Sequence, residues 1–131
     1  MITIDTSGLV AALFQRDRNH ARVAATLANA TPPRLIPTAI LAEIAYLLES
    51  RKQHGALDAV LEDIESGFYE LDCGDENVPR VRQLMRRYED LPLGLSEACV
   101  IACAESHGGH VLTVDRDFWV VSGEGQLTIV P

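Results

Sequence analysis

The sequence has few cysteines and no long apolar run. Its three cysteines, Cys73, Cys99 and Cys103, form no CxxC pair, which excludes a disulfide framework and suits a reducing compartment. The longest uninterrupted apolar run, 98–104, is far shorter than the ~18 residues that a membrane span requires. The first residues lack the basic and apolar regions of a secretion signal. We therefore expect a cytoplasmic protein that makes no use of a membrane.

Lysine and aromatic residues are also scarce. Lys52 is the single lysine, aromatic residues make up 5% of the chain, and the formal net charge is −8. This charge has the wrong sign for a protein that binds nucleic acid through bulk electrostatics, and so few aromatics provide no obvious platform for stacking bases. The other basic residues are arginines, whose forked guanidinium suits phosphate. Phosphate binding is therefore still compatible with the sequence, provided that the acidic residues gather at a metal site.

The length and the hydrophobic content are typical of one compact domain. The chain has 131 residues, 47% of them hydrophobic, and such a chain buries a core without disulfides or a structural metal. No internal repeat, low-complexity tract or Gly/Ser-rich linker divides it. We expect a single domain over residues 1–131.

The apolar periodicity predicts strands that alternate with helices. Strands are expected at 2–4, 35–36, 68–71, 110–114 and 127–130, and helices at 9–14, 21–30, 37–48, 57–64, 78–88 and 96–105. Thr6 or Ser7 is expected to cap the first helix, and Gly55 to break the chain before the fourth. This alternation predicts an α/β fold with a parallel sheet and helices on both faces.

Acidic residues stand where the predicted elements meet. Asp5 and Asp115 each follow an apolar strand, Glu97 lies in the first turn of a helix, and Glu43 interrupts an apolar helix face. The carboxyl ends of parallel strands share one edge of a sheet, where ligands bind, so these acids are expected to converge, with Asp117 as a further member. Without these five acids the net charge of the remaining residues is −3.

A cluster of carboxylates suits a hard divalent cation such as Mg²⁺ or Mn²⁺ better than Zn²⁺. Such a cation lowers the pKa of a bound water and screens a phosphodiester, so the pattern predicts a phosphodiesterase. Each acid also has a purely structural interpretation. Asp5 or Asp115 would serve as a turn or capping residue, and Glu97, after Ser96, suits any helix N-terminus. Glu43 is harder to explain this way, because a charged side chain is seldom buried without a partner.

Four segments, in order, resemble the PIN-domain ribonucleases, specifically the VapC toxins of prokaryotic VapBC toxin–antitoxin pairs. They are IDTSGLVAAL at 4–13, PTAILAE at 37–43, DLPLGLSEA at 90–98 and LTVDRDF at 112–118. The resemblance covers the whole chain. It implies a three-layer α/β/α sandwich with strand order 3-2-1-4-5 and Mg²⁺-dependent endoribonuclease activity on structured RNA such as tRNA or rRNA, with Mn²⁺ as a substitute ion. It also implies a homodimer that a small VapB-type antitoxin neutralises.

The resemblance also implies roles for individual residues. Asp5, Glu43, Glu97 and Asp115 take the four acidic positions. Asp5 and Glu97 hold Mg²⁺ directly, and Glu43 and Asp115 complete the pocket, partly through water. Thr113 and Asp117 take accessory roles. The family usually has Asp where this chain has Glu97, so the alternative is a catalytically silent PIN module that binds RNA or antitoxin without cleaving.

A Cys/His group and two groups of arginines each allow a functional and a structural interpretation. Cys99, Cys103 and His107 stand four residues apart, which suits either a soft-metal site or simple core packing. Two groups of arginines are candidate RNA contacts or solvated faces. The first lies near the end of the first strand and comprises Arg16, Arg18 and Arg22. The second lies on one predicted helix and comprises Arg80, Arg82, Arg86 and Arg87.

Overall fold

Five short parallel strands form the centre of the molecule. The computed structural model describes residues 1–123 and 127–131. Its strands are β1 (Ile2–Ile4), β2 (Arg34–Pro37), β3 (Glu70–Asp72), β4 (His110–Leu112) and β5 (Thr128–Val130). They pair in the order β3-β2-β1-β4-β5, all parallel. The predicted class and strand order are confirmed, and β1 and β4, the strands that precede Asp5 and Asp115, lie inside the sheet.

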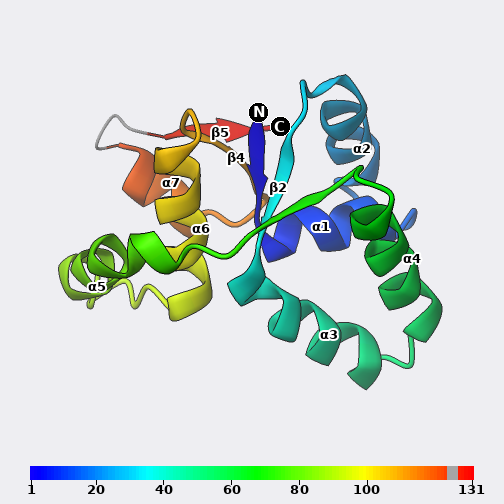
Figure 1. Ribbon diagram of the computed structural model, residues 1–131, viewed down its shortest axis with the longest axis horizontal. Helices are drawn as coiled ribbons and strands as arrows, with labels where there is room; N and C mark the ends of the chain where they lie inside the picture. The colour runs from blue at the N-terminus through cyan, green and yellow to red at the C-terminus, as the bar shows by residue number, and fades with distance from the viewer. Residues whose placement is uncertain (124–126) are drawn as a thin grey trace.

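Helices cover both faces of this sheet, as predicted. They are α1 (Thr6–Leu13), α2 (His20–Asn29), α3 (Leu41–Ser50), α4 (His54–Glu65), α5 (Val78–Arg87), α6 (Leu95–Ser106) and α7 (Asp117–Ser122). Short 3₁₀ turns precede α3 and α5. Figure 1 shows α1, α2 and α4 on one side of the strands and α5, α6 and α7 on the other. Within the described ranges, no helix has the length and apolar character needed to cross a bilayer.

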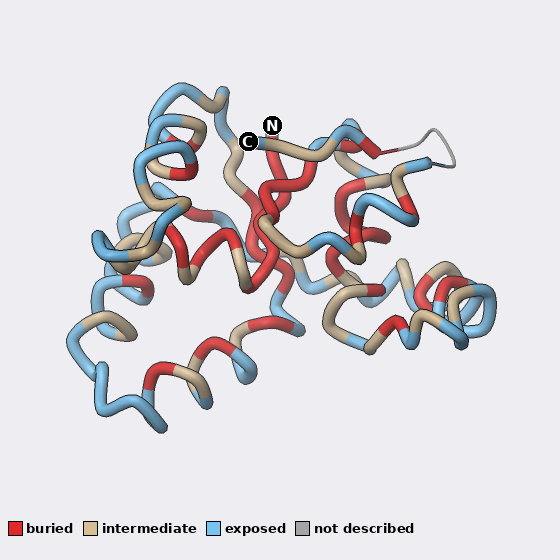
Figure 2. Tube along the Cα trace, turned by 180° about the vertical axis from the view of Figure 1, so that it is seen from behind, coloured by how far each residue is buried: buried red, intermediate tan, exposed pale blue. Residues whose placement is uncertain are grey.

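The core lies between the sheet and the inner helix faces (Figure 2). Ile4 and Leu112 of the inner strands are fully buried. Helix α6 packs on β1, β2 and β4, and its buried alanines permit this close packing. On the other face, a Cβ built on Gly8 of α1 would lie 2.5 Å from the Leu112 carbonyl oxygen, so only glycine fits there. This approach brings the start of α1 against the end of β4.

The structure differs from the predicted elements in several places. Pro37 ends β2 instead of starting a helix, because a 3₁₀ turn separates it from α3, and β4 ends at Leu112, two residues before the predicted end. Helix α7 was not predicted, because Val120, Val121 and Trp119 favour strands in isolation. Gly55 lies in the first turn of α4 instead of preceding it, and β3 begins at Glu70. The α1 cap is neither Thr6 nor Ser7, since the Asp5 side chain accepts the Ser7 N–H. These are errors of local propensity, and they leave the predicted topology unchanged.

Candidate active site

A pocket of about 320 Å³ opens at the carboxyl ends of β1 and β4. All four predicted acidic positions line it, although they come from four separate segments of the chain. The lining residues are Asp5, Thr6, Ser7, Val10, Asp17, Glu43, Leu47, Arg51, Glu97, Val114 and Asp115. The predicted convergence is therefore observed. It follows from the parallel sheet, which places the ends of neighbouring strands at one edge.

Asp5 is the buried acid of the pocket, with 5% of its surface exposed. The Ser7 hydroxyl donates to Asp5 Oδ2 at 2.7 Å, and the Thr113 hydroxyl donates to the same oxygen at 2.9 Å. The Ser7 backbone N–H donates to it at 3.3 Å. Burial raises the pKa of Asp5, and these hydrogen bonds offset only part of the rise. The bonds converge on Oδ2 and fix the carboxylate in one orientation.

The same two hydroxyls connect Asp5 to the segment after β4. Ser7 Oγ accepts the Val114 N–H, and Thr113 Oγ1 accepts the Asp115 N–H, both at 3.0 Å. Each hydroxyl therefore donates to the Asp5 carboxylate and accepts from the backbone near Asp115. In this geometry Thr113 orients Asp5, and its accessory role in a reaction stays a prediction. Ser7 orients Asp5 in the same way, which the sequence interpretation missed although Ser7 stands two residues after Asp5.

Glu97 lies at the start of α6 and faces the other acids. Its Oε2 accepts the Gly94 N–H at 2.6 Å, so one oxygen caps the helix. Burial raises the pKa of Glu97, and three neighbouring negative charges raise it further: Asp115, Asp5 and Asp117. Both interpretations of Glu97 are therefore realised at once, because it caps α6 and also belongs to the acidic cluster.

Asp115 and Glu43 also line the pocket. Asp115 is half-buried, and its Oδ1 accepts the Asp117 N–H at 2.9 Å at the start of α7. Glu43 is exposed, which corrects the expectation that it stands on a buried helix face. The apolar stripe of α3 passes beside Glu43, with Ile44 and Leu48 buried. Its charge therefore remains in contact with water and needs no partner.

Two further lining residues were not predicted from the sequence. Glu43, Leu47 and Arg51 are spaced four residues apart. Arg51 directly follows α3 and continues the face of that helix that carries Glu43 and Leu47. Asp17 reaches the pocket from the connection between α1 and α2. The spacing of Arg51 from Glu43 was a readable signal, because it places a cation beside the acidic site.

The predicted arginine contacts lie outside the lining of the pocket. Arg16, Arg18 and Arg22 are exposed, and the first two flank Asp17. On α5, Arg80 makes a two-point ion pair with Glu105 of α6, with N–O distances of 2.8 and 2.9 Å. Arg80 is thus a link between two helices, and the second arginine group is not a continuous solvent-facing strip.

The donor set of the pocket fits a hard divalent cation. Carboxylates and hydroxyls supply only oxygen, and Thr6 Oγ1 is buried without a hydrogen-bond partner among the described residues. No three of the four acids have carboxylate oxygens that all lie within 4.8 Å of one another. Among the described residues, one group meets this limit, and it lies outside this pocket. Mg²⁺ retains several waters and needs only one or two direct carboxylates. The spacing therefore suits Mg²⁺ better than a fully protein-coordinated ion.

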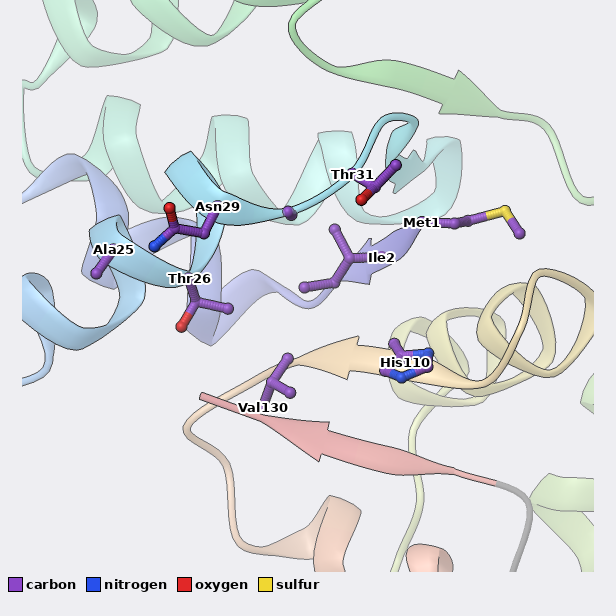
Figure 3. Close-up of a pocket in the computed structure, with 9 residues that line it drawn as sticks. Met1, Ile2, Ala25, Thr26, Asn29, Thr31, His110 and Val130 are labelled. Carbon is purple, nitrogen blue, oxygen red and sulfur yellow. The ribbon is translucent and has the colours of Figure 1, made fainter.

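A larger pocket of about 500 Å³ lies between the start of β1, α2 and the β4–β5 edge (Figure 3). Its lining is largely apolar, with Ile2 and Val130 facing the space and His110 at its margin. None of the described lining residues is acidic. It therefore lacks the chemistry of the first pocket.

Comparisons with known proteins agree with this fold. The family model described as PIN domain matches residues 2–124. Ribonuclease VapC26 of Mycobacterium tuberculosis (strain ATCC 25618 / H37Rv) is 27% identical over 133 residues, covering 98% of each protein. The crystal structure of Mycobacterium tuberculosis VapC20, described as a sarcin-ricin loop cleaving toxin, superposes with a TM-score of 0.82 at 21% identity, covering all of both chains. The resemblance read from the sequence motifs is confirmed.

Proposed function

Because this chain belongs to the PIN domain family, we propose that it is a metal-dependent endoribonuclease and the toxin of a toxin–antitoxin pair. The observation that carries the proposal is the convergence of Asp5, Glu43, Glu97 and Asp115 on one pocket. The similarity to Ribonuclease VapC26 over 98% of the chain supports it. We take residues 1–131 as one such domain.

The chemistry follows from the arrangement of these side chains. Asp5 and Glu97 would hold Mg²⁺, or Mn²⁺, with Glu43 and Asp115 acting partly through water. The bound ion supplies charge neutralisation at a phosphodiester and a more acidic water. Ser7 and Thr113 hold Asp5 in one orientation, so no reorganisation of this acid is needed during the reaction. Asp117 assists by placing its N–H on Asp115.

The proposed substrate is structured RNA, such as tRNA or rRNA. Arg51 lines the acidic pocket, and its guanidinium would contact a phosphate next to the scissile bond. The exposed Arg16, Arg18 and Arg22 would contact the backbone further along the RNA. Placing these cations around a metal-neutralised pocket overcomes the unfavourable net charge of −8.

The first experiment measures cleavage of total RNA by antitoxin-free protein with Mg²⁺ or Mn²⁺, beside an EDTA control and Asp5→Ala. We expect cleavage that EDTA and Asp5→Ala both abolish. The variant loses a helix cap, at a cost of about 1 kcal/mol, and circular dichroism should still show a folded domain. Unchanged cleavage by Asp5→Ala would refute the assignment of the site.

The proposed partners are a VapB-type antitoxin and a second copy of this chain. An antitoxin that inserts a basic side chain among the acids would replace the metal ion. The three cysteines are free, which agrees with the predicted cytoplasmic location. The check is whether the product of an adjacent small open reading frame co-purifies with the chain and whether the complex contains two copies of it. Purification of the chain alone from cells expressing both would contradict the antitoxin proposal.

One observation favours the second candidate, a catalytically silent module. Glu97 commits Oε2 to the Gly94 N–H, which leaves a single oxygen for a cation. The test compares the natural chain with Glu97→Asp, whose shorter side chain cannot make the same capping bond. Cleavage by the natural chain excludes the silent module. Cleavage by Glu97→Asp alone would establish that Glu97 has silenced the site.

A further inference from the structure

A second group of metal-ligating side chains lies away from the acidic pocket. One ligand atom from each of Asp72, Cys103 and His107 lies within 4.8 Å of the others, and this is the one such group among the described residues. Asp72 ends β3, whereas Cys103 lies in the last turn of α6 and His107 directly follows that helix. The sequence had suggested Cys99 as the third member of this set. The structure places Asp72 there instead, because strand and helix meet at this point.

The Asp72 carboxylate lies beside the Cys103 thiol, and this contact helps burial to raise the pKa of the thiol. Asp72 Oδ2 is buried and forms no hydrogen bond within the part of the chain that the structure describes. A buried carboxylate oxygen without a donor is costly. Asp72 and Cys103 also line a small cavity of about 20 Å³, which is close to the space of a single water molecule or ion. This cavity and the unpaired oxygen point to an occupant of ionic size.

The other two side chains are already oriented beside each other. His107 Nδ1 lies 2.8 Å from the Cys103 carbonyl oxygen and 3.9 Å from Cys103 Sγ. Nδ1 donates its proton to this carbonyl, which holds the imidazole next to the thiol and leaves Nε2 as the nitrogen free to bind a metal. Two ligands of a tetrahedral Zn²⁺ ion lie about 3.3–3.6 Å apart, given its usual bond lengths. Small side-chain shifts would therefore complete the coordination.

We propose that Asp72, Cys103 and His107 bind one Zn²⁺ ion, with water in the fourth position. A mixed sulfur, nitrogen and oxygen set suits Zn²⁺ and not Mg²⁺. An open pocket of about 370 Å³ borders Asp72 and His107 and gives the ion and its water a path from solvent. Binding removes the proton of the Cys103 thiol and releases it to solvent. No electron is transferred.

The site would join the edge of the sheet to its central helix. Among the described strands, β3 pairs with β2 alone. Glu70 and Leu71 on it are exposed, so few contacts hold this strand in place. Zn²⁺ would tie the end of β3 to α6, the helix whose first turn carries Glu97. The expected role is stabilisation of this edge, independent of the proposed ribonuclease chemistry.

The test uses Co²⁺ and Zn²⁺ on full-length protein freed of metal with EDTA. Bound Co²⁺ shows an intense near-ultraviolet charge-transfer band only when a thiolate is a ligand, and none of the described residues that line the acidic pocket carries a thiol. We expect one equivalent of Co²⁺ to produce this band, Zn²⁺ to displace it, and Zn²⁺ to raise the melting temperature. His107→Gln keeps the buried thiol and should abolish the band and weaken Zn²⁺ binding at least ~tenfold.

Two matched controls separate this site from its neighbours. Cys73→Ser changes the exposed cysteine next to Asp72 and should retain the band, and Asp5→Ala should retain it because the acidic pocket is not involved. Absence of the band in the natural chain, its persistence in His107→Gln, or its loss in Cys73→Ser would each overturn the proposal. Loss of RNA cleavage in Asp5→Ala with the band intact would show that the two sites are separate.

Discussion

Thr113 shows how a single buried hydroxyl controls the candidate active site. It is 2% exposed, donates to Asp5 Oδ2 at 2.9 Å and accepts the Asp115 N–H at 3.0 Å. Valine has nearly the same shape as threonine but neither bond. Replacing Thr113 with valine would therefore let the Asp5 carboxylate rotate, and the Asp115 N–H would lose its acceptor.

We predict that Thr113→Val lowers kcat/KM for RNA cleavage about tenfold and destabilises the fold by about 1–3 kcal/mol. Cleavage kinetics and urea unfolding provide the two measurements. Thr128→Val is the matched control, because Thr128 is exposed on β5 and should change stability by less than about 0.5 kcal/mol. Equal effects of the two substitutions on cleavage would contradict the positioning role of Thr113.

The raised pKa values of Asp5 and Glu97 predict a dependence on pH. Each folded-state pKa lies above the ordinary values of 3.8 and 4.5, so the folded protein holds these protons more tightly than the unfolded chain. In EDTA, the free energy of unfolding should therefore fall as pH rises from the ordinary values through the raised ones. Cation binding requires the ionised forms, so cleavage should fail on acidification at a pH above the ordinary carboxyl range.

Glu97→Gln is the variant that tests this pH dependence. Glutamine retains an oxygen that can accept the Gly94 N–H, but it carries no charge. The free energy of unfolding in urea should change less with pH for this variant than for the natural chain. RNA cleavage should be lost. A profile identical to that of the natural chain would mean that Glu97 does not titrate in this window.

At the scale of elements, the packing of α1 on β4 determines where Asp5 lies. The Leu112 carbonyl oxygen accepts the Asp5 N–H at 3.1 Å, and it would lie 2.5 Å from a Cβ on Gly8. A side chain at Gly8 would therefore push α1 away from β4 and move the Asp5 backbone with it.

We predict that Gly8→Ala destabilises the protein by about 1–3 kcal/mol, even though alanine favours helices, and lowers cleavage as well. Gly55→Ala is its control, because Gly55 lies in α4 with nothing within 4 Å of the added Cβ. That change should stabilise the protein by roughly 0.5–1 kcal/mol. Chemical denaturation of both variants measures the difference, and a stable Gly8→Ala protein would show that α1 can shift without cost.

For the whole molecule, the net charge of −8 is unevenly distributed. Six acids lie in or beside one pocket, whereas the other 13 acids and the 11 basic residues are spread over the chain, and Arg51 is the one described basic residue that lines the pocket. Crowded carboxylates destabilise the folded state when they are ionised, so a cation bound among them should stabilise it.

We predict that Mg²⁺ raises the melting temperature of the natural chain at neutral pH and has much less effect on Asp5→Ala. Sodium chloride at the same ionic strength controls for general screening of the negative surface. Scanning fluorimetry or calorimetry measures the shift. Equal shifts in both proteins would mean that Mg²⁺ acts on the net charge and not at the pocket.

The sequence by itself determined the topology and the main acids. Asp5 and Asp115 were identifiable because parallel strands end at one edge of a sheet, and Glu97 because it opens a helix directed at that edge. Four motifs, in the expected order along the chain, were sufficient to identify the family. Helix α7 and the bounds of β3 were less predictable, because short elements depend on packing more than on propensity.

Only the tertiary structure decided which side chains share a surface. Glu43 and Arg51 line the pocket because α3 packs against α1, the helix that follows Asp5. Asp72 meets Cys103 and His107 because β3 ends beside α6, and no sequence spacing records that contact. Periodicity and capping act over a few residues and can be read locally, whereas these groups are brought together by the packing of segments far apart in the chain.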